Sequence, residues 1–460
     1  MNCAGGNPTM SFLGAAGTVT GSKYLIETDN KKILIDCGLF HGVKSLRKRN
    51  WQTLPVNPAT LDAVLLTHAH LDHSGYLPIL KRNGFSGPIF CTSGTATLAK
   101  ILLRDAAYLQ EEDAKYANRK KFSKHQRAMP LFTQADVLAA LNLVRSVPFE
   151  QLTPICNGVT ATFYRAGHIL GAAWIRLNIN GTSIVFSGDL GRPIDAVMKP
   201  PAALVHADNL VVESTYGNRQ HEPQPAKEIL EKVVNATVQR DGIVLIPAFS
   251  VGRSQSVLRL LAILREEGRI PNVPVFLNSP MAINATEIFC EHSDEHKLTP
   301  RDCRAMCEVS TYVNSPSASR ALNQRAGPMI VISASGMATG GRILHHFKAW
   351  LGDARNTVLF TGFQATGTRG ADMLHGAKTI RIHGHEYDVS ANIEAITSLS
   401  AHADSDELIA WIGSGAIEPP KKTFITHGES DASQALCERI NGLLGWHAEV
   451  PGDGSRHELA

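Results

Sequence analysis

The sequence lacks the features of several specialised protein classes. Its 460 residues contain no apolar run approaching the roughly 18 residues that cross a bilayer, and no basic segment followed by an apolar one opens the chain, so neither a membrane span nor a signal peptide is expected. The eight cysteines form no C-x-x-C pair, which favours a reduced, cytoplasmic protein over a disulfide framework. The formal net charge is only +3, so any nucleic-acid affinity must come from local patches.

What remains is an ordinary globular composition with one unusual feature. Hydrophobic residues make up 43% and charged residues 19%, which excludes disorder, collagen and coiled coil as the main architecture. The length favours two or three domains. The unusual feature is the 19 histidines, whose positions direct the functional interpretation.

The pattern of apolar residues divides the chain into three segments. Up to residue 207, short strands between Gly-rich turns surround a mostly helical stretch at 95–147, which predicts a β-sandwich flanked by helices. From 208 to 392, strands alternate with helices, which predicts a parallel sheet with right-handed crossovers. The last segment, 393–460, carries a strand that ends in histidine and a final helix. Cys303 and Cys307, one turn apart on a predicted helix, are interpreted as packing residues.

The strongest chemical signal follows the predicted strand at 63–67. Three histidines and an aspartate stand within six residues there, as His68, His70, Asp72 and His73. Imidazole and carboxylate groups in this density suit borderline metals such as Zn²⁺. Exposed histidines at the start of a polar helix are the alternative, and the six-residue arrangement argues against it.

Three further metal-capable side chains follow predicted strands and lie next to glycine. They are His168, Asp189 and His427. One such residue alone would be a core histidine or a turn aspartate. Because several strands are each followed by a metal-capable side chain next to glycine, we predict that these residues share one metal centre.

These motifs resemble the metallo-β-lactamase fold, and the inserted segment resembles the β-CASP family of nucleases. The opening Gly14–Ser22 and Asp36 match that family's first motif, while Glu213 in ESTYG, His402 in SAHAD and His427 match its motifs A, B and C. The resemblance points to the RNA-processing branch, related to the nuclease subunit of the cleavage and polyadenylation specificity factor. It implies an α/β protein with a metallo-β-lactamase αββα sandwich (1–207 and 393–460) and an inserted β-CASP domain (208–392).

The resemblance also implies how two Zn²⁺ ions are held. One ion would take His68, His70 and His168, the other Asp72, His73 and His427, with Asp189 as the bridge. Asp36 would orient a ligand or the histidine loop. In the di-iron branch of the fold a carboxylate usually replaces His70, so histidine favours a hydrolytic zinc site.

Two residues are candidates for proton transfer. His402 is expected to protonate the leaving oxygen, and Glu213 to orient it and keep it cationic. A capping contact at a helix N-terminus is the alternative role for Glu213.

Three glycine-rich loops of the inserted segment are candidates for phosphate contact, because helix N-termini and exposed N–H groups favour anions. Their residues are Arg253, Ser335, Gly336, Thr339, Gly340, Arg342, Thr368 and Arg369. The basic segments 44–49 and 115–127 are either solvated helix faces or further RNA contacts.

The expected function is zinc-dependent hydrolysis of single-stranded RNA in RNA processing or decay. An endonuclease is favoured, with 5′–3′ exonuclease activity and a homodimer left open. A DNA nuclease of the same family is one alternative, but many such members carry an apolar residue at the position of His427. A small-molecule hydrolase is disfavoured by the inserted segment, and a non-catalytic RNA-binding protein by the complete ligand set.

Overall fold

The computed structural model describes residues 7–120, 126–362, 364, 367–415 and 418–459. The chain separates into two compact units. The first unit comprises Met1–Pro193, Pro200–Gln220 and His402–Ala460, and the second comprises Ile194–Lys199 and His221–Ala401. Part of the predicted basic segment, residues 121–125, lies outside the described residues.

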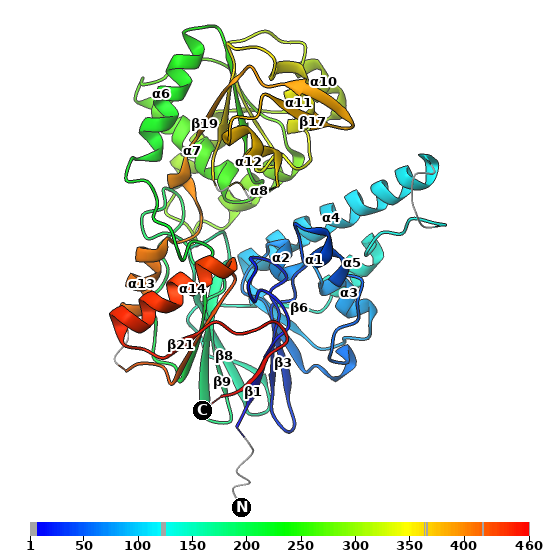
Figure 1. Cartoon of the computed structure of the whole chain (residues 1–460), viewed down its shortest axis with the longest axis vertical. Helices are drawn as coiled ribbons and strands as arrows, with labels where there is room; N and C mark the ends of the chain where they lie inside the picture. Colours follow the sequence, from blue (N-terminus) through cyan, green and yellow to red (C-terminus); the bar gives the residue numbers. More distant parts are fainter. Residues whose placement is uncertain (1–6, 121–125, 363, 365–366, 416–417, 460) are drawn as a thin grey trace, which may run out of the picture. The chain divides into compact units, whose positions relative to one another are not determined.

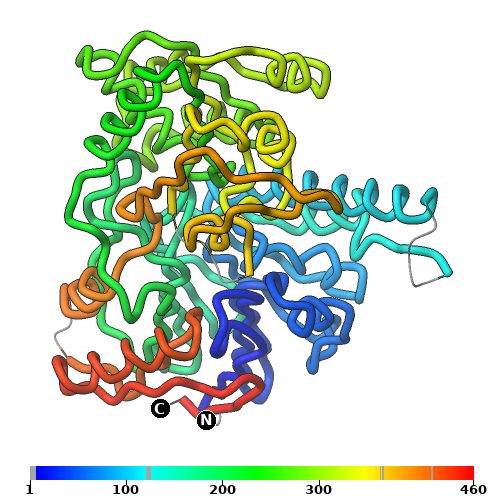
Figure 2. The backbone as a smooth tube through the Cα atoms, turned by 45° about the horizontal axis from the view of Figure 1, so that its top comes forward, coloured from blue at the N-terminus to red at the C-terminus, as the bar shows by residue number. Residues whose placement is uncertain are grey.

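Two sheets of seven strands each account for the described strands of the first unit (Figure 1). One has the order β22 (Arg456–Glu458), β1 (Thr9–Phe12), β2 (Tyr24–Glu27), β3 (Lys32–Ile35), β4 (Ala63–Leu65), β5 (Ile89–Thr92) and β6 (Val144–Val147). The other has the order β21 (Ala448–Glu449), β20 (Lys422–Thr426), β11 (Asn209–Glu213), β10 (Thr182–Phe186), β9 (Ala173–Ile179), β8 (Val159–Arg165) and β7 (Thr153–Cys156). Figure 2 shows the blue start and the red end of the chain side by side, where β1 pairs with β22.

The core of this unit contains apolar side chains from both sheets. Phe12 of β1 and Phe424 of β20 are fully buried, with ring centroids 5.2 Å apart. Ile35, Phe163 and Ile175 belong to the same cluster. Burying a large apolar side chain contributes about 1.5–3 kcal/mol, so this shared core holds the strand ends that carry the site.

Helices border these sheets. They are α1 (Lys44–Arg49), α2 (Leu71–Ser74), α3 (Leu77–Arg82), α4 (Ser93–Lys120), α5 (Gln134–Leu141), α13 (Ser405–Gly413) and α14 (Ser430–Arg439). Among the described residues, none of the helices is both long and apolar enough to cross a membrane.

The direction of the strands brings the candidate site residues to one edge of the second sheet. β10 pairs in parallel with β11, and β11 pairs in parallel with β20. The carboxyl ends of parallel strands meet at the same edge of a sheet. Asp189, Glu213 and His427 stand at or just beyond these three ends, so residues more than two hundred positions apart are delivered to one place.

The second unit contains a six-stranded parallel sheet among its described residues. Its order is β14 (Thr311–Tyr312), β13 (Val275–Leu277), β15 (Met329–Ser333), β12 (Ile243–Pro247), β16 (Thr357–Phe360) and β19 (Asn392–Ala395). The helices of this unit are α6 (Ala226–Val238), α7 (Arg253–Glu266), α8 (Pro280–Glu291), α9 (Pro300–Glu308), α10 (Pro316–Leu322), α11 (Ile343–Trp350) and α12 (Arg369–Leu374). The predicted architecture, a sandwich flanked by helices with a separate parallel-sheet unit, is confirmed.

The structure differs from the sequence-based expectation at two points. β17 (Thr379–Ile382) is not in the parallel sheet but pairs antiparallel with β18 (His385–Asp388), because His383 and Gly384 both take positive φ in a two-residue turn. The main stretch of the second compact unit runs from His221 to Ala401, whereas the pattern of strands and helices predicts 208–392. The reason is that β11 looks like the first strand of the alternating segment but pairs with β10 and β20.

Candidate metal centre

The histidine loop lies between β4 and α2 and is held by backbone hydrogen bonds. Cys37 N donates to His73 O at 2.7 Å, and Ser22 N donates to Asp72 O at 2.9 Å. Gly38 packs so closely here that a Cβ atom would lie 1.5 Å from Asp72 O. The loop therefore depends on a glycine at position 38.

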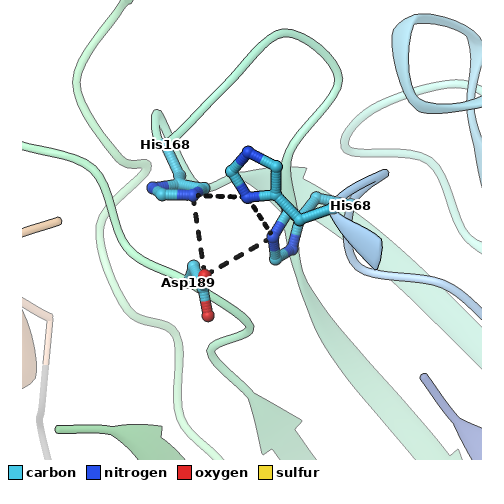
Figure 3. Close-up of side chains that lie close together, drawn as sticks. His68, His168 and Asp189 are labelled. Atoms are coloured by element: carbon cyan, nitrogen blue, oxygen red, sulfur yellow. Dashed lines mark hydrogen bonds and ion pairs between the residues drawn. The ribbon is translucent and has the colours of Figure 1, made fainter. Parts of the chain in front are cut away.

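One group of ligand atoms comes from His68, His70, His168 and Asp189. All of these atoms lie within 4.8 Å of one another. Nδ1 of His70 is 3.2 Å from Nε2 of His68 and 3.2 Å from Nε2 of His168. Asp189 Oδ2 is 3.4 Å from the nearest nitrogen of His68 and 3.5 Å from that of His168, and Figure 3 shows both histidines turned toward this carboxylate.

A second group contains Asp72, His73 and His427, whose ligand atoms also lie within 4.8 Å of one another. Nε2 of His73 is 3.0 Å from Nε2 of His427. Asp189 serves this group as well, because its Oδ1 lies 3.2 Å from Nε2 of His73. One carboxylate thus faces both groups, one oxygen toward each.

Neighbouring oxygens set which ring nitrogens are free to ligate. Asp36 Oδ2 accepts from Nδ1 of His73 at 2.7 Å, so the lone pair of His73 is on Nε2. Thr67 Oγ1 donates to Asp36 and lies 3.1 Å from Nδ1 of His68, from which it accepts. Thr215 Oγ1 lies 3.2 Å from Nδ1 of His427. The sequence interpretation missed both threonines. Thr67 directly precedes His68 and could have been noticed there, whereas only the fold brings Thr215 to a histidine 212 positions away.

The arrangement fits a cation. Nε2 of His73 and Nε2 of His427 approach each other to 3.0 Å, a contact that requires a proton or a metal ion between the two nitrogens. Asp189 Oδ1 is buried and accepts no regular hydrogen bond from the described residues. The histidine and carboxylate set is the one that divalent zinc prefers.

The electrostatics favour positive charge at the same place. Burial opposes charging of His73, but the Asp189 and Asp36 carboxylates outweigh it and raise its pKa well above the ordinary value. Burial would raise the pKa of Asp72, yet His427 and His73 hold it well below its usual range. Burial lowers the pKa of His68, which keeps that ring neutral and able to ligate.

His402 and Glu213 form a pair beside this cluster. Nδ1 of His402 donates to the two oxygens of Glu213 at 3.1 and 3.2 Å. Burial disfavours the charged imidazole, but the Glu213 carboxylate raises the pKa of His402 to about 9. Nε2 of His402 is 3.9 Å from Asp189 Oδ2, so the ring edge that can donate a proton faces the metal centre.

The segment that carries His402 is anchored on both sides. Ala403 N donates to Leu190 O, and Leu190 N donates to Glu213 Oε1 at 2.7 Å. Asp404 then caps α13 through a reciprocal pair of hydrogen bonds with Glu407. Glu213 therefore holds the Asp189 loop and His402 together.

The eight predicted phosphate contacts all lie in the second unit, and two of their arginines bind the protein itself. Arg342 donates to Asn278 Oδ1 at 2.7 Å and to the backbone carbonyls of Val313 and Asn314. Arg369 donates to the carbonyls of Arg381 and Ala338. A guanidinium has five donors, so these contacts hold the loops while leaving some donors for a ligand.

The remaining members of this set are placed as follows. Ser335 Oγ accepts from Thr339 N at 3.2 Å, and Thr368 Oγ1 caps α12 by accepting from Ala371 N. Gly340 has open space around it, whereas Gly336 packs against the ring of Phe249. Arg253 is buried at the start of α7. The basic segment 44–49 forms the short helix α1, none of whose residues is buried.

Comparison with known families explains both units. A metallo-beta-lactamase superfamily model matches residues 25–213, a Beta-Casp domain model matches 254–373, and the model of a Zn-dependent metallo-hydrolase RNA specificity domain matches 386–451. A ribonuclease from Thermus thermophilus is 35% identical, covering 92% of this chain and 94% of its own. The chain belongs to the β-CASP family of metallo-β-lactamase-fold ribonucleases.

One further relative and one solved structure resemble the chain over most of its length. A transcription termination factor from Methanosarcina mazei is 31% identical over 94% of this chain and 68% of its own length. A crystal structure of a protein of unknown function from Enterococcus faecalis covers 98% of this chain and 99% of its own with a TM-score of 0.55, and at 14% identity it supports the fold alone. The predicted family, fold class and metal-dependent hydrolase activity on RNA are confirmed, and the fold implies a divalent-metal site.

Proposed function

We propose that this β-CASP protein is a zinc-dependent ribonuclease that hydrolyses phosphodiester bonds of single-stranded RNA, mainly as an endonuclease. The observation that carries the proposal is that two groups of ligand atoms meet at Asp189. We assign one Zn²⁺ to His68, His70 and His168, a second to Asp72, His73 and His427, and the bridging role to Asp189. Paired zinc ions supply Lewis-acid chemistry, which activates water and neutralises charge on a phosphodiester.

The protein side chains position this chemistry. Asp36 holds His73 in the tautomer that presents Nε2, and Thr67 does the same for His68. His402, kept cationic by Glu213, donates a proton to the leaving ribose oxygen. The hydrogen bonds that these residues make support the proposed roles, and each role can be tested by one substitution.

The loops of the second unit are proposed to contact the RNA backbone. The sequence predicts that backbone N–H groups of the glycine-rich turns share this role with Arg253, Arg342 and Arg369. The hydrogen bonds of Arg342 and Arg369 support a narrower version, in which these arginines hold the loops and backbone N–H groups near Gly340, which has open space beside it, bind phosphate. Binding of this kind is independent of base sequence and weakens with added salt.

The alternatives are a DNA nuclease and a small-molecule hydrolase of the same fold. The RNA specificity domain match at 386–451 and the ribonuclease relative from Thermus thermophilus favour RNA. A cytoplasmic location and a homodimer remain proposals, and sedimentation of the purified protein checks the second.

A cleavage assay with matched substrates tests the function. Purified protein, analysed first for zinc, is incubated with RNA and DNA strands of the same sequence, each labelled at the 5′ end. We expect about two zinc ions per chain and cleavage of RNA into internal fragments. The Asp189→Asn variant should lose both zinc and cleavage, while Asp208→Asn, a carboxylate bound to Ser183 away from the centre, should keep both.

Several outcomes would overturn the proposal. Equal cleavage of DNA would make the protein a general nuclease. Release of single 5′ nucleotides alone would replace the endonuclease with an exonuclease. Full zinc content in Asp189→Asn would refute the ligand assignment.

A further inference from the structure

Three cysteines of the second unit gather between α8 and α9. Cys290 belongs to α8, whereas Cys303 and Cys307 belong to α9. Sγ of Cys290 lies 3.8 Å from Sγ of Cys307, and both residues are half-buried. The sequence interpretation treats Cys303 and Cys307 as packing residues, and only the tertiary fold brings Cys290 to them.

This pair differs chemically from the fully buried thiols of the chain. Burial raises the pKa of Cys37 and of Cys91 to about 12, so both stay protonated and unreactive. The hydrogen-bond contact with the Cys290 sulfur, against the effect of burial, lowers the pKa of Cys307 to about 6. A thiolate is the form that reacts with oxidants.

Two neighbours complete the site. The Tyr312 hydroxyl lies beside Cys307, is buried, and has no regular hydrogen bond to the described residues, so it can stabilise a thiolate there. Cys303, on α9, also interacts with the Cys290 thiol. A reactive thiol, a second thiol within reach and a buried hydroxyl together form the minimal dithiol of a redox-sensitive site.

We propose that Cys290 and Cys307 form a peroxide-sensitive dithiol that closes to a disulfide between α8 and α9. The Cys307 thiolate attacks one oxygen of hydrogen peroxide, the O–O bond breaks, and Cys307 sulfenic acid forms while hydroxide leaves and takes up a proton as water. The Cys290 sulfur then attacks the Cys307 sulfur, the S–O bond breaks, and a second water leaves. Two thiols are oxidised and one peroxide is reduced. A dithiol reductant reverses the bond.

The arrangement of cleavage sites makes the pairing directly measurable. Trypsin places the three cysteines on separate peptides, Cys290 on 270–297, Cys303 on 302–304 and Cys307 on 305–320. The zinc-loaded full chain is treated with hydrogen peroxide, its free thiols are alkylated, and the non-reduced digest is analysed by mass spectrometry. We expect peptides 270–297 and 305–320 joined with the loss of two hydrogens, and separated again by dithiothreitol.

Substitutions separate the proposed pair from its neighbours. Cys307→Ser and Cys290→Ser should each reduce the cross-linked peptide to background, and Cys290→Ser should leave Cys307 open to dimedone, which traps sulfenic acid. Cys303→Ser should keep the cross-link. Cys156→Ser, at another half-buried thiol in the first unit, is the matched control and should have no effect.

The digest of the wild-type protein alone tests the proposal. The test therefore remains valid even if one of the variants fails to fold. A cross-link between 270–297 and 302–304 would assign the partner role to Cys303 instead and refute the pair. Alkylation of both Cys290 and Cys307 after peroxide treatment would refute the site altogether. Neither result depends on RNA cleavage, so the proposed ribonuclease is tested separately.

Discussion

Replacing Asp36 by asparagine should weaken zinc binding without removing any ligand. Asp36 is fully buried, and its Oδ1 accepts from Thr67 N at 2.8 Å while its Oδ2 accepts from Nδ1 of His73 at 2.7 Å. The amide oxygen of asparagine must stay with Thr67 N, so the amide NH₂ takes the place of Oδ2. That group donates, and His73 must respond by moving its proton from Nδ1 to Nε2.

The tautomer change sets the expected magnitude. With the proton on Nε2, His73 no longer offers a lone pair to the zinc ion that we propose it shares with His427, and ligation requires the less favourable tautomer. Loss of such an orienting partner lowers metal affinity about 10–100-fold, which corresponds to about 1.4–2.7 kcal/mol. The loss of the buried negative charge acts in the same direction.

The assay is competition for zinc between the protein and a chelator of known affinity. Asp208→Asn is the matched control, because its carboxylate also accepts from a backbone N–H and a hydroxyl, those of Ser183, but touches no histidine. Thermal unfolding of the zinc-free proteins separates a metal effect from a general loss of stability. If Asp36→Asn binds zinc as tightly as Asp208→Asn, the tautomer argument is wrong and Asp36 only supports the loop.

Three further substitutions test separate parts of the site. The His402→Ala variant should keep its zinc, and its cleavage rate should fall about 10²–10⁴-fold. A substrate with a sulfur leaving group, which needs no proton, should recover much of that rate. Loss of zinc or absence of rescue would count against the acid role. The Arg342→Ala variant should bind RNA more weakly at unchanged zinc content. Because the change removes hydrogen bonds to Asn278 and two carbonyls, it should also lower the free energy of unfolding by about 1.5–3 kcal/mol. Unchanged RNA binding and an unchanged unfolding midpoint would exclude a role of Arg342 in holding the loop. Gly38→Ala should yield little zinc-loaded protein, since the methyl group would lie 1.5 Å from Asp72 O, and normal zinc content would contradict this packing.

Local sequence was sufficient to identify most candidate residues of the site. The cluster from His68 to His73 is contiguous, and each of Asp189, Glu213 and His427 stands at or just after a strand of buried residues. That these residues meet at one edge was implied by the family resemblance, because the strand pattern alone assigns the strand that ends at Glu213 to the inserted segment. The two-unit organisation could be predicted, as the change from short strands to alternating strands and helices reflects a change in how sheets are connected.

Only the tertiary structure decided which partners these residues have. Thr215 reaches His427 across 212 positions, Arg342 donates to carbonyls rather than pointing only at solvent, and Cys290 meets Cys307 between two helices. The pairing of β11 with β20 likewise joins segments that no local pattern connects. Hydrogen bonds and thiol contacts act over about 3–4 Å, so they depend on how segments distant in the sequence pack against each other. Strand and helix patterns, in contrast, are determined by residues that are neighbours in the sequence.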